Sequence, residues 1–183
     1  MLGIVLNGGG AKGAYQLGVW KYIIEIGLDR YISVFIGSSV GALNAVLFAN
    51  GDYTQAEAIW TSDGLREEII PSLHIKDIFK RKSLYRSRKG LANIINSVDF
   101  LRSRENSRKV YATYSKLSLG VRKGKKACVS KKNESIGQKF FSFLYSKNYA
   151  VEVNSLPKEE STKLLLATSA LPFVSNCLQK MHG

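Results

Sequence analysis

The chain has 183 residues, of which 45% are hydrophobic and 22% charged, a composition typical of one globular domain with its own core. No internal repeat occurs, and no apolar run approaches the ~20 residues of a membrane-spanning helix. The N-terminal residues lack a basic segment before a long apolar stretch, so we expect no secretory signal and a cytoplasmic protein. Cys128 and Cys177 stand alone, and because no cluster of metal ligands exists we expect neither a metal nor an organic cofactor.

The formal net charge is +13, and the excess of basic residues is concentrated in one stretch. Residues 76–132 contain 18 Lys or Arg and 3 Asp or Glu. Such a block indicates a polyanionic partner, either a membrane surface or nucleic acid, although a solvated face is the plain alternative. The stretch lacks the interleaved aromatic residues of a nucleic-acid reader, so we expect no nucleic acid. The candidate contacts to an anionic membrane are Lys80, Arg81, Lys82, Arg86, Arg88 and Lys89.

The first fifty residues predict alternating strands and helices. An apolar run at 2–6 predicts a buried strand, and apolar residues at helical spacing predict a helix over 14–26. A second strand is expected at 32–36, and a short, apolar helix at 40–50, followed by a glycine. This βαβα order predicts an α/β fold with a mostly parallel central sheet.

The rest of the chain has weaker patterns. We expect a helix over 90–98, a strand over 109–114 and a short strand over 127–129. A further helix is expected over 158–170, because two glutamates lie in its first turn and Pro172 follows it.

The first motif with chemical meaning lies between the second strand and the helix that follows it. It is the G-x-S-x-G pentapeptide Gly37, Ser38, Ser39, Val40 and Gly41. In a strand–turn–helix context this pattern is typical of a nucleophile elbow, which presents the middle serine at a helix N-terminus. The sequence therefore predicts Ser39 as the nucleophile. The alternative is a turn in which a serine only caps the helix.

The second motif follows the first strand directly. It is the glycine loop Gly8, Gly9, Gly10, Ala11, Lys12 and Gly13. Glycines allow successive backbone N–H groups to form a concave anion site, and one such donor to a developing oxyanion is worth on the order of 10²–10³ in rate. We therefore expect this loop to be an oxyanion hole, to which Lys12 adds positive charge.

The same loop also matches G-x-G-x-x-G, the pattern of dinucleotide-binding proteins. That reading requires an acidic residue at the end of the second strand to hold the ribose. Here the second strand ends in Gly37–Ser39, and the nearest acid, Asp29, precedes the strand. A Rossmann-type protein is therefore the less favoured reading, and a phosphate-binding P-loop is excluded because its Gly-Lys-Ser/Thr ending is absent.

The order and spacing of the two motifs resemble the patatin-like phospholipases. The stretch Leu164–Phe173 resembles the helix end and the Ala-Ser-x-Ala-x-Pro block of that family. The resemblance implies a three-layer α/β/α fold with a mostly parallel central sheet, spanning residues 1–183 as one domain with 76–132 as a variable basic insert. It also implies a cofactor-free Ser–Asp dyad, as in calcium-independent phospholipase A2 enzymes, acting on a phospholipid or other acyl-ester lipid.

The partner of the serine is the missing part of this pattern. In the family the base is an Asp in an Asp-Gly-Gly or Asp-Gly-Ala turn after the Ala-x-Pro block, and the sequence stops at Gly183 before such a turn. Asp63-Gly64 lies in the wrong place, and His74 lies in the basic stretch. His182 fits an α/β-hydrolase triad by chain order only, because in that fold the elbow follows several strands and here it follows two. We therefore expect a truncated piece of a longer enzyme, with an apparently shortened C-terminus and little activity of its own.

These features together predict a serine lipid acyl hydrolase similar to phospholipase A or lysophospholipase, peripherally bound to an anionic membrane surface. Two alternatives stay open. One is a catalytically inactive patatin-like fragment. The other is a basic module that binds a membrane or nucleic acid, in which the serine motif is vestigial.

Overall fold

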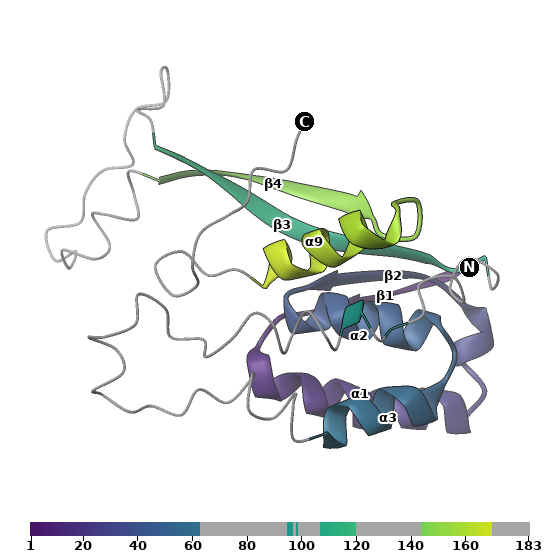
Figure 1. The fold of residues 1–183 in the computed structure, drawn as a ribbon. Coiled ribbons are helices and arrows are strands. Elements are labelled where there is room, and N and C mark those ends of the chain that lie inside the picture. Colours follow the sequence, from purple (N-terminus) through teal and green to yellow (C-terminus); the bar gives the residue numbers. More distant parts are fainter. Residues whose placement is uncertain (63–94, 97, 99–106, 120–143, 170–183) are drawn as a thin grey trace, which may run out of the picture. The chain divides into compact units, whose positions relative to one another are not determined.

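The computed structural model describes residues 1–62, 95–96, 98, 107–119 and 144–169 (Figure 1). Strands and α-helices alternate through the first fifty residues, as the sequence predicts. In chain order the elements are β1 (Leu2–Leu6), η1 (Gly10–Lys12), α1 (Gly13–Glu25), η2 (Asp29–Tyr31), β2 (Ile32–Ser38), α2 (Val40–Ala49), α3 (Tyr53–Thr61), β3 (Lys109–Leu119), β4 (Leu144–Glu152) and α9 (Lys158–Thr168).

The strands form one sheet in the order β1-β2-β3-β4. β2 pairs in parallel with both β1 and β3, and Gly37 lies opposite Leu6 on one side and Ala112 on the other. β1 and β2 therefore end at the same edge of the sheet, beside Ala112 and Thr113 of β3, and β3 continues from there to Leu119. An α/β fold with a mostly parallel sheet, predicted from the sequence, is confirmed.

An aromatic cluster holds α1 and α2 on the sheet. The ring of Trp20 on α1 stacks on Phe48 of α2, with centroids 5.0 Å apart, and meets Phe35 of β2 edge-on at 5.6 Å. All three side chains are buried, and every residue of α2 is buried as well. Since aromatic residues bury large areas and add ring–ring attraction, this cluster sets the position of α2 relative to β2.

Besides the short helices η1 and η2, two elements of the described residues are absent from the sequence predictions. One is α3, whose N-cap Asp52 accepts a hydrogen bond from Gln55 N at 3.1 Å. The Asp-x-x-Gln spacing is a capping signal that would have revealed this helix. The other is β4, whose sequence LYSKNYAVE mixes polar and apolar residues without a clean alternation. Residues 95 and 96 of the expected 90–98 helix are helical, whereas the strand expected at 127–129 lies outside the described residues.

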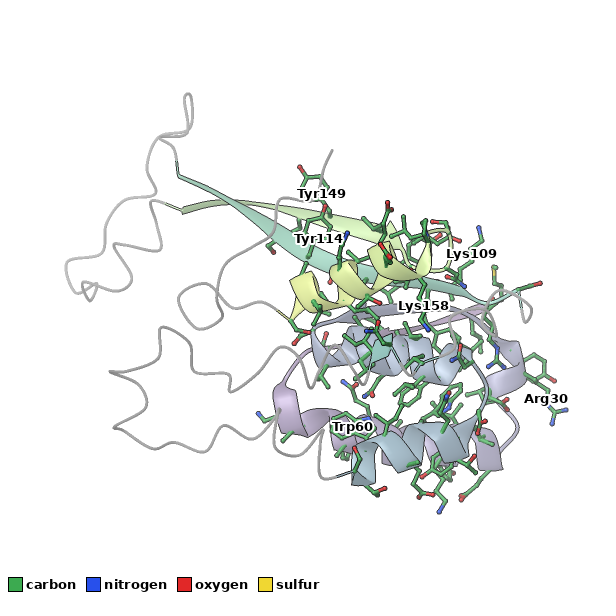
Figure 2. The ribbon with its side chains drawn as sticks, in the orientation of Figure 1. Arg30, Trp60, Lys109, Tyr114, Tyr149 and Lys158 are labelled. Atoms are coloured by element: carbon green, nitrogen blue, oxygen red, sulfur yellow. The ribbon has the colours of Figure 1, made fainter. Side chains whose placement is uncertain are left out.

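The chain divides into two compact units, one of residues 1–113 and 150–183 and the other of residues 114–149. In the second unit, the Tyr114 and Tyr149 rings stack with centroids 5.3 Å apart (Figure 2), and Ser115 Oγ donates to Asn148 Oδ1 at 2.7 Å. These contacts join β3 and β4 within that unit. Among the residues that the structure describes, no helix combines the length and the apolar character needed to cross a bilayer.

One residue of the basic stretch, Arg108, has a structural role in the first unit. Its guanidinium donates to the Phe48 and Asp29 carbonyls, each at 3.3 Å, and lies 3.7 Å from the Asp29 carboxylate. The Phe48 carbonyl belongs to the last turn of α2, where the helix dipole favours a cation. Arg108 therefore joins the end of α2 to the loop before β2.

The role of Arg108 is testable by comparing it with its neighbour. Replacing Arg108 by Met removes two charge-assisted hydrogen bonds, and we expect the free energy of unfolding to fall by about 1.5–3 kcal/mol. Lys109→Met changes the same charge at an exposed side chain and should stay within about 0.5 kcal/mol of the parent. Urea denaturation followed by circular dichroism measures both, and equal losses in the two variants would contradict the assigned role.

Candidate active site

The turn between β2 and α2 has the backbone geometry of a sharp elbow. Ser39, the residue between the two elements, has φ 55° and ψ −128°. This positive φ is unusual for a residue with a side chain. The Ser39 carbonyl accepts hydrogen bonds from Ala42 N at 2.9 Å and Leu43 N at 3.4 Å, which begins α2. The side chain of Ser39 therefore projects where β2 ends and the N-terminus of α2 begins.

The two glycines of the pentapeptide lie where no side chain fits. A Cβ built on Gly37 would overlap the Gly41 carbonyl, and a Cβ built on Gly41 would overlap the Leu6 and Asn7 carbonyls. The first turn of α2 therefore packs directly on the end of β1. This close approach leaves no space for a side chain two residues before or two residues after Ser39, so both positions require glycine.

The glycine loop lies beside the elbow. A Cβ built on Gly8 would be 3.0 Å from Ser39 Cβ and 3.2 Å from the Ser38 carbonyl oxygen. Gly10 has φ 56°, a conformation that favours glycine, and begins the short helix η1. Gly8 and Gly9 are exposed, as is Lys12, whereas Gly13 is buried. The structure thus brings the two predicted motifs together at the carboxyl ends of β1 and β2, with the loop open to solvent.

Thr168, the last residue of α9, forms a hydrogen bond with the elbow. Ser39 N donates to Thr168 Oγ1 at 2.9 Å, and the Thr168 hydroxyl in turn donates to the Thr113 carbonyl on β3. Thr113 Oγ1 also donates to the Gly37 carbonyl at 3.3 Å. Ser39 N–H is used in this bond, and within the glycine loop Lys12 N–H donates to the Gly9 carbonyl and Gly13 N–H to the Gly10 and Ala11 carbonyls. The first N–H groups of α2 have no partner within the helix. Sequence reasoning noticed the stretch around Thr168 but not its contact with Ser39.

Several predicted residues lie outside the described part of the chain. These are Asp63, His74, His182, and the membrane candidates Lys80, Arg81, Lys82, Arg86, Arg88 and Lys89. The two aspartates that the structure does describe have structural partners: Asp29 lies beside Arg108, and Asp52 caps α3. Within the same described ranges, no three His, Cys, Asp or Glu side chains form a group that could hold a metal ion.

The arrangement of the described residues suits acyl transfer. A hydroxyl at a helix N-terminus, next to a glycine-rich loop, is placed where backbone N–H groups and the helix dipole favour negative charge. An ester carbonyl held between them would meet a nucleophile on one side and hydrogen-bond donors on the other.

Comparison with known proteins agrees with this chemistry. Residues 4–179 match the family model of the patatin-like phospholipases. A lysophospholipase, nte1, of Aspergillus terreus (strain NIH 2624 / FGSC A1156) is 46% identical over 48 residues, which make up 26% of this chain and 3% of that protein. The match therefore spans only a small part of this curated relative. No solved structure is significantly similar to the chain.

The bond between Ser39 and Thr168 can be tested with a pair of substitutions. Thr168→Val keeps the shape of the side chain but leaves Ser39 N–H and the Thr113 carbonyl without their partner. We expect it to lower the free energy of unfolding by about 1–3 kcal/mol and to speed hydrogen exchange at the Ser39 amide. Thr168→Ser keeps the hydroxyl and should retain most of the stability and most of the protection of the Ser39 amide from exchange. A Ser39 amide that exchanges equally slowly in the valine variant would show that the bond does not hold the elbow.

Proposed function

The chain belongs to the patatin-like phospholipase family, and from this premise we propose that it is a lipid acyl hydrolase whose nucleophile is Ser39. The observation that carries the proposal is the backbone of Ser39, which has φ 55° at the start of α2 and lies against Gly8. A serine that only caps a helix has extended backbone geometry and does not need a left-handed turn. The cost of holding such a turn supports a functional role for the hydroxyl.

The proposed reaction has two steps. Ser39 Oγ attacks the ester carbonyl carbon of the lipid while its proton passes to a general base. The tetrahedral intermediate collapses, the lipid alcohol leaves with a proton, and an acyl-enzyme ester remains on Ser39. Water then attacks this ester, releasing the fatty acid and returning the proton to Ser39. The substrate is a phospholipid or another acyl-ester lipid.

The proposed oxyanion hole is formed by backbone amides of the glycine loop, residues 8–13. Support comes from the contact between Gly8 and the elbow and from the exposure of Gly8 and Gly9, which leaves the loop open to a ligand. Its donors would stabilise negative charge on the carbonyl oxygen during both steps. Lys12, exposed at the end of η1, adds a positive charge to the same loop.

The general base is assigned by family resemblance. It would be an aspartate in an Asp-Gly-Gly or Asp-Gly-Ala turn, a sequence that residues 1–183 do not contain. Asp29 and Asp52, which have the structural partners described above, are not proposed for this role. Without a general base, proton transfer loses a contribution of about 10²–10⁴ in rate. Weak hydrolysis by this chain alone would therefore agree with the proposal.

The nucleophile is tested by a matched pair of adjacent serines. Ser39→Ala should abolish labelling by a fluorophosphonate probe and any hydrolysis of a panel of phospholipids and lysophospholipids. Ser38→Ala removes the neighbouring hydroxyl and should leave labelling in place, because Ser38 is still part of β2. Labelling is measured by mass spectrometry of the intact protein and of its peptides. Labelling that persists in Ser39→Ala and is lost in Ser38→Ala would refute the assignment.

We also propose peripheral binding to an anionic membrane surface through the basic stretch 76–132. The support is the charge of that stretch, with 18 Lys or Arg against 3 Asp or Glu, and a substrate that resides in membranes. Each basic residue near an anionic leaflet is worth about 1 kcal/mol, an attraction that salt screens. One domain over residues 1–183, with this stretch as an insert, is also proposed, and the family match over residues 4–179 supports it.

Vesicle sedimentation tests the membrane surface. We expect binding to vesicles that contain phosphatidylserine, weak binding to pure phosphatidylcholine, and release as the salt concentration rises. Replacing Lys80 and Lys82 by Glu should reduce the bound fraction several-fold. The same replacement at Lys158 and Lys163, two exposed positions on α9, serves as a control for net charge. Equal loss in both variants, or tight binding to nucleic acid without binding to vesicles, would contradict the proposal.

A further inference from the structure

A buried amide in α2 connects the elbow helix with the glycine loop. Asn44 is fully buried, and it is a polar residue within an otherwise apolar helix, VGALNAVLFA. Its Nδ2 donates to the Gly13 carbonyl at 3.0 Å and to Gln16 Oε1 at 2.8 Å, while its Oδ1 accepts from Trp60 Nε1 at 2.7 Å. Trp60 lies on α3 (Figure 2). The Asn44 side chain thus hydrogen-bonds to two residues of α1 and one residue of α3.

Gln16 extends this connection to the beginning of the loop. Its Nε2 donates to the Asn7 carbonyl at 2.7 Å, and Asn7 directly precedes Gly8. Gly13 is the last residue of the loop and the first of α1. One hydrogen-bonded chain, Asn7–Gln16–Asn44, therefore holds the start of the loop, while the bond from Asn44 to Gly13 holds its end. Both attachments lead to α2, the helix that begins directly after Ser39.

We propose that Asn44 and Gln16 are positioning residues that hold the two ends of the glycine loop at a set distance from Ser39. The inference rests on the proposed function, because it assigns the loop to the oxyanion. A loop with three successive glycines has wide conformational freedom, and it is exposed at Gly8 and Gly9. An oxyanion donor must lie about 3 Å from the developing charge, and a misplacement of about 1 Å can cost on the order of 10²-fold in rate.

The chemistry of the amide explains why a leucine would not serve in its place. A buried polar side chain lowers stability unless its bonds are made, so an apolar helix gains nothing from Asn44 through packing alone. Asn provides a donor for a carbonyl at the loop's end and a donor for Gln16 at the same time. An apolar residue of the same size would fill the space but would leave residues 7–13 tied to α2 only by packing.

Three variants separate positioning from general stability. Asn44→Leu removes every bond of the amide. Gln16 is half-buried, and Gln16→Glu keeps an acceptor for Asn44 Nδ2 but lacks the donor to the Asn7 carbonyl. This variant therefore tests the loop even if Asn44→Leu folds poorly. Val46→Ala is the control, because Val46 is buried in the same helix two residues along and lies outside the hydrogen-bonded chain. Each protein is measured for its unfolding midpoint, for amide hydrogen exchange, and for the rate of fluorophosphonate labelling.

We expect Gln16→Glu and Asn44→Leu to speed exchange at the hydrogen-bonded loop amides of Lys12 and Gly13 at least tenfold more than at the core amides. Labelling of Ser39 should slow by about 10- to 100-fold in both. If ester turnover is measurable, kcat should fall while KM stays nearly constant, because the loop acts on the transition state. Val46→Ala should lower the unfolding midpoint without a selective change in loop exchange or labelling.

Loop exchange and labelling that follow global stability in all three variants would overturn the inference. The two readouts also separate it from the proposed function. If the probe modifies a residue other than Ser39 in the unaltered chain, the assignment of the nucleophile fails. The exchange data then still decide whether Asn44 and Gln16 hold the loop, since exchange needs no chemistry at Ser39.

Discussion

Ser39 has φ 55° and ψ −128°, a backbone conformation that costs a residue with a side chain about 1–3 kcal/mol and persists only when its surroundings hold it. Three neighbours hold it here. Gly37 and Gly41 lack the side chains that would prevent β2, α2 and the end of β1 from approaching one another. Thr168 accepts the Ser39 N–H and fastens it to β3. The elbow is therefore imposed by its surroundings, and the placement of the rest of the site follows from it.

The parallel sheet brings these neighbours to one edge. Because β1, β2 and β3 run in the same direction, β1 and β2 both end beside Thr113 of β3, so the glycine loop and the elbow that follow them lie next to that residue. α9 then supplies Thr168 from 129 residues further along the chain. Elements that are far apart in sequence thus meet around a single serine, where α9 supplies the Thr168 hydroxyl and β3 the Thr113 carbonyl.

Helix α2 belongs both to the hydrophobic core and to the site. The cluster of Trp20, Phe35 and Phe48 sets α2 against β2, and Arg108 binds the last turn of α2. The first turn of the same helix carries the elbow, while Asn44 in its middle binds α1 and α3. Since close-packed interiors transmit displacements, a shift of α2 would move the serine and the glycine loop together.

The sequence by itself determined the elements with strong local signals. β1 has the predicted bounds Leu2–Leu6, and β2 and α2 differ from prediction only at their ends, because apolar spacing and glycine stops are read within a few residues. It also placed the glycine loop beside Ser39, since parallel strands end at the same edge of a sheet. Only the tertiary structure revealed β4, the bond from Ser39 N–H to Thr168, and the buried hydrogen bonds of Asn44. Each of these depends on partners that are distant along the chain, and local patterns of hydrophobicity contain no information on which distant donor will meet which acceptor.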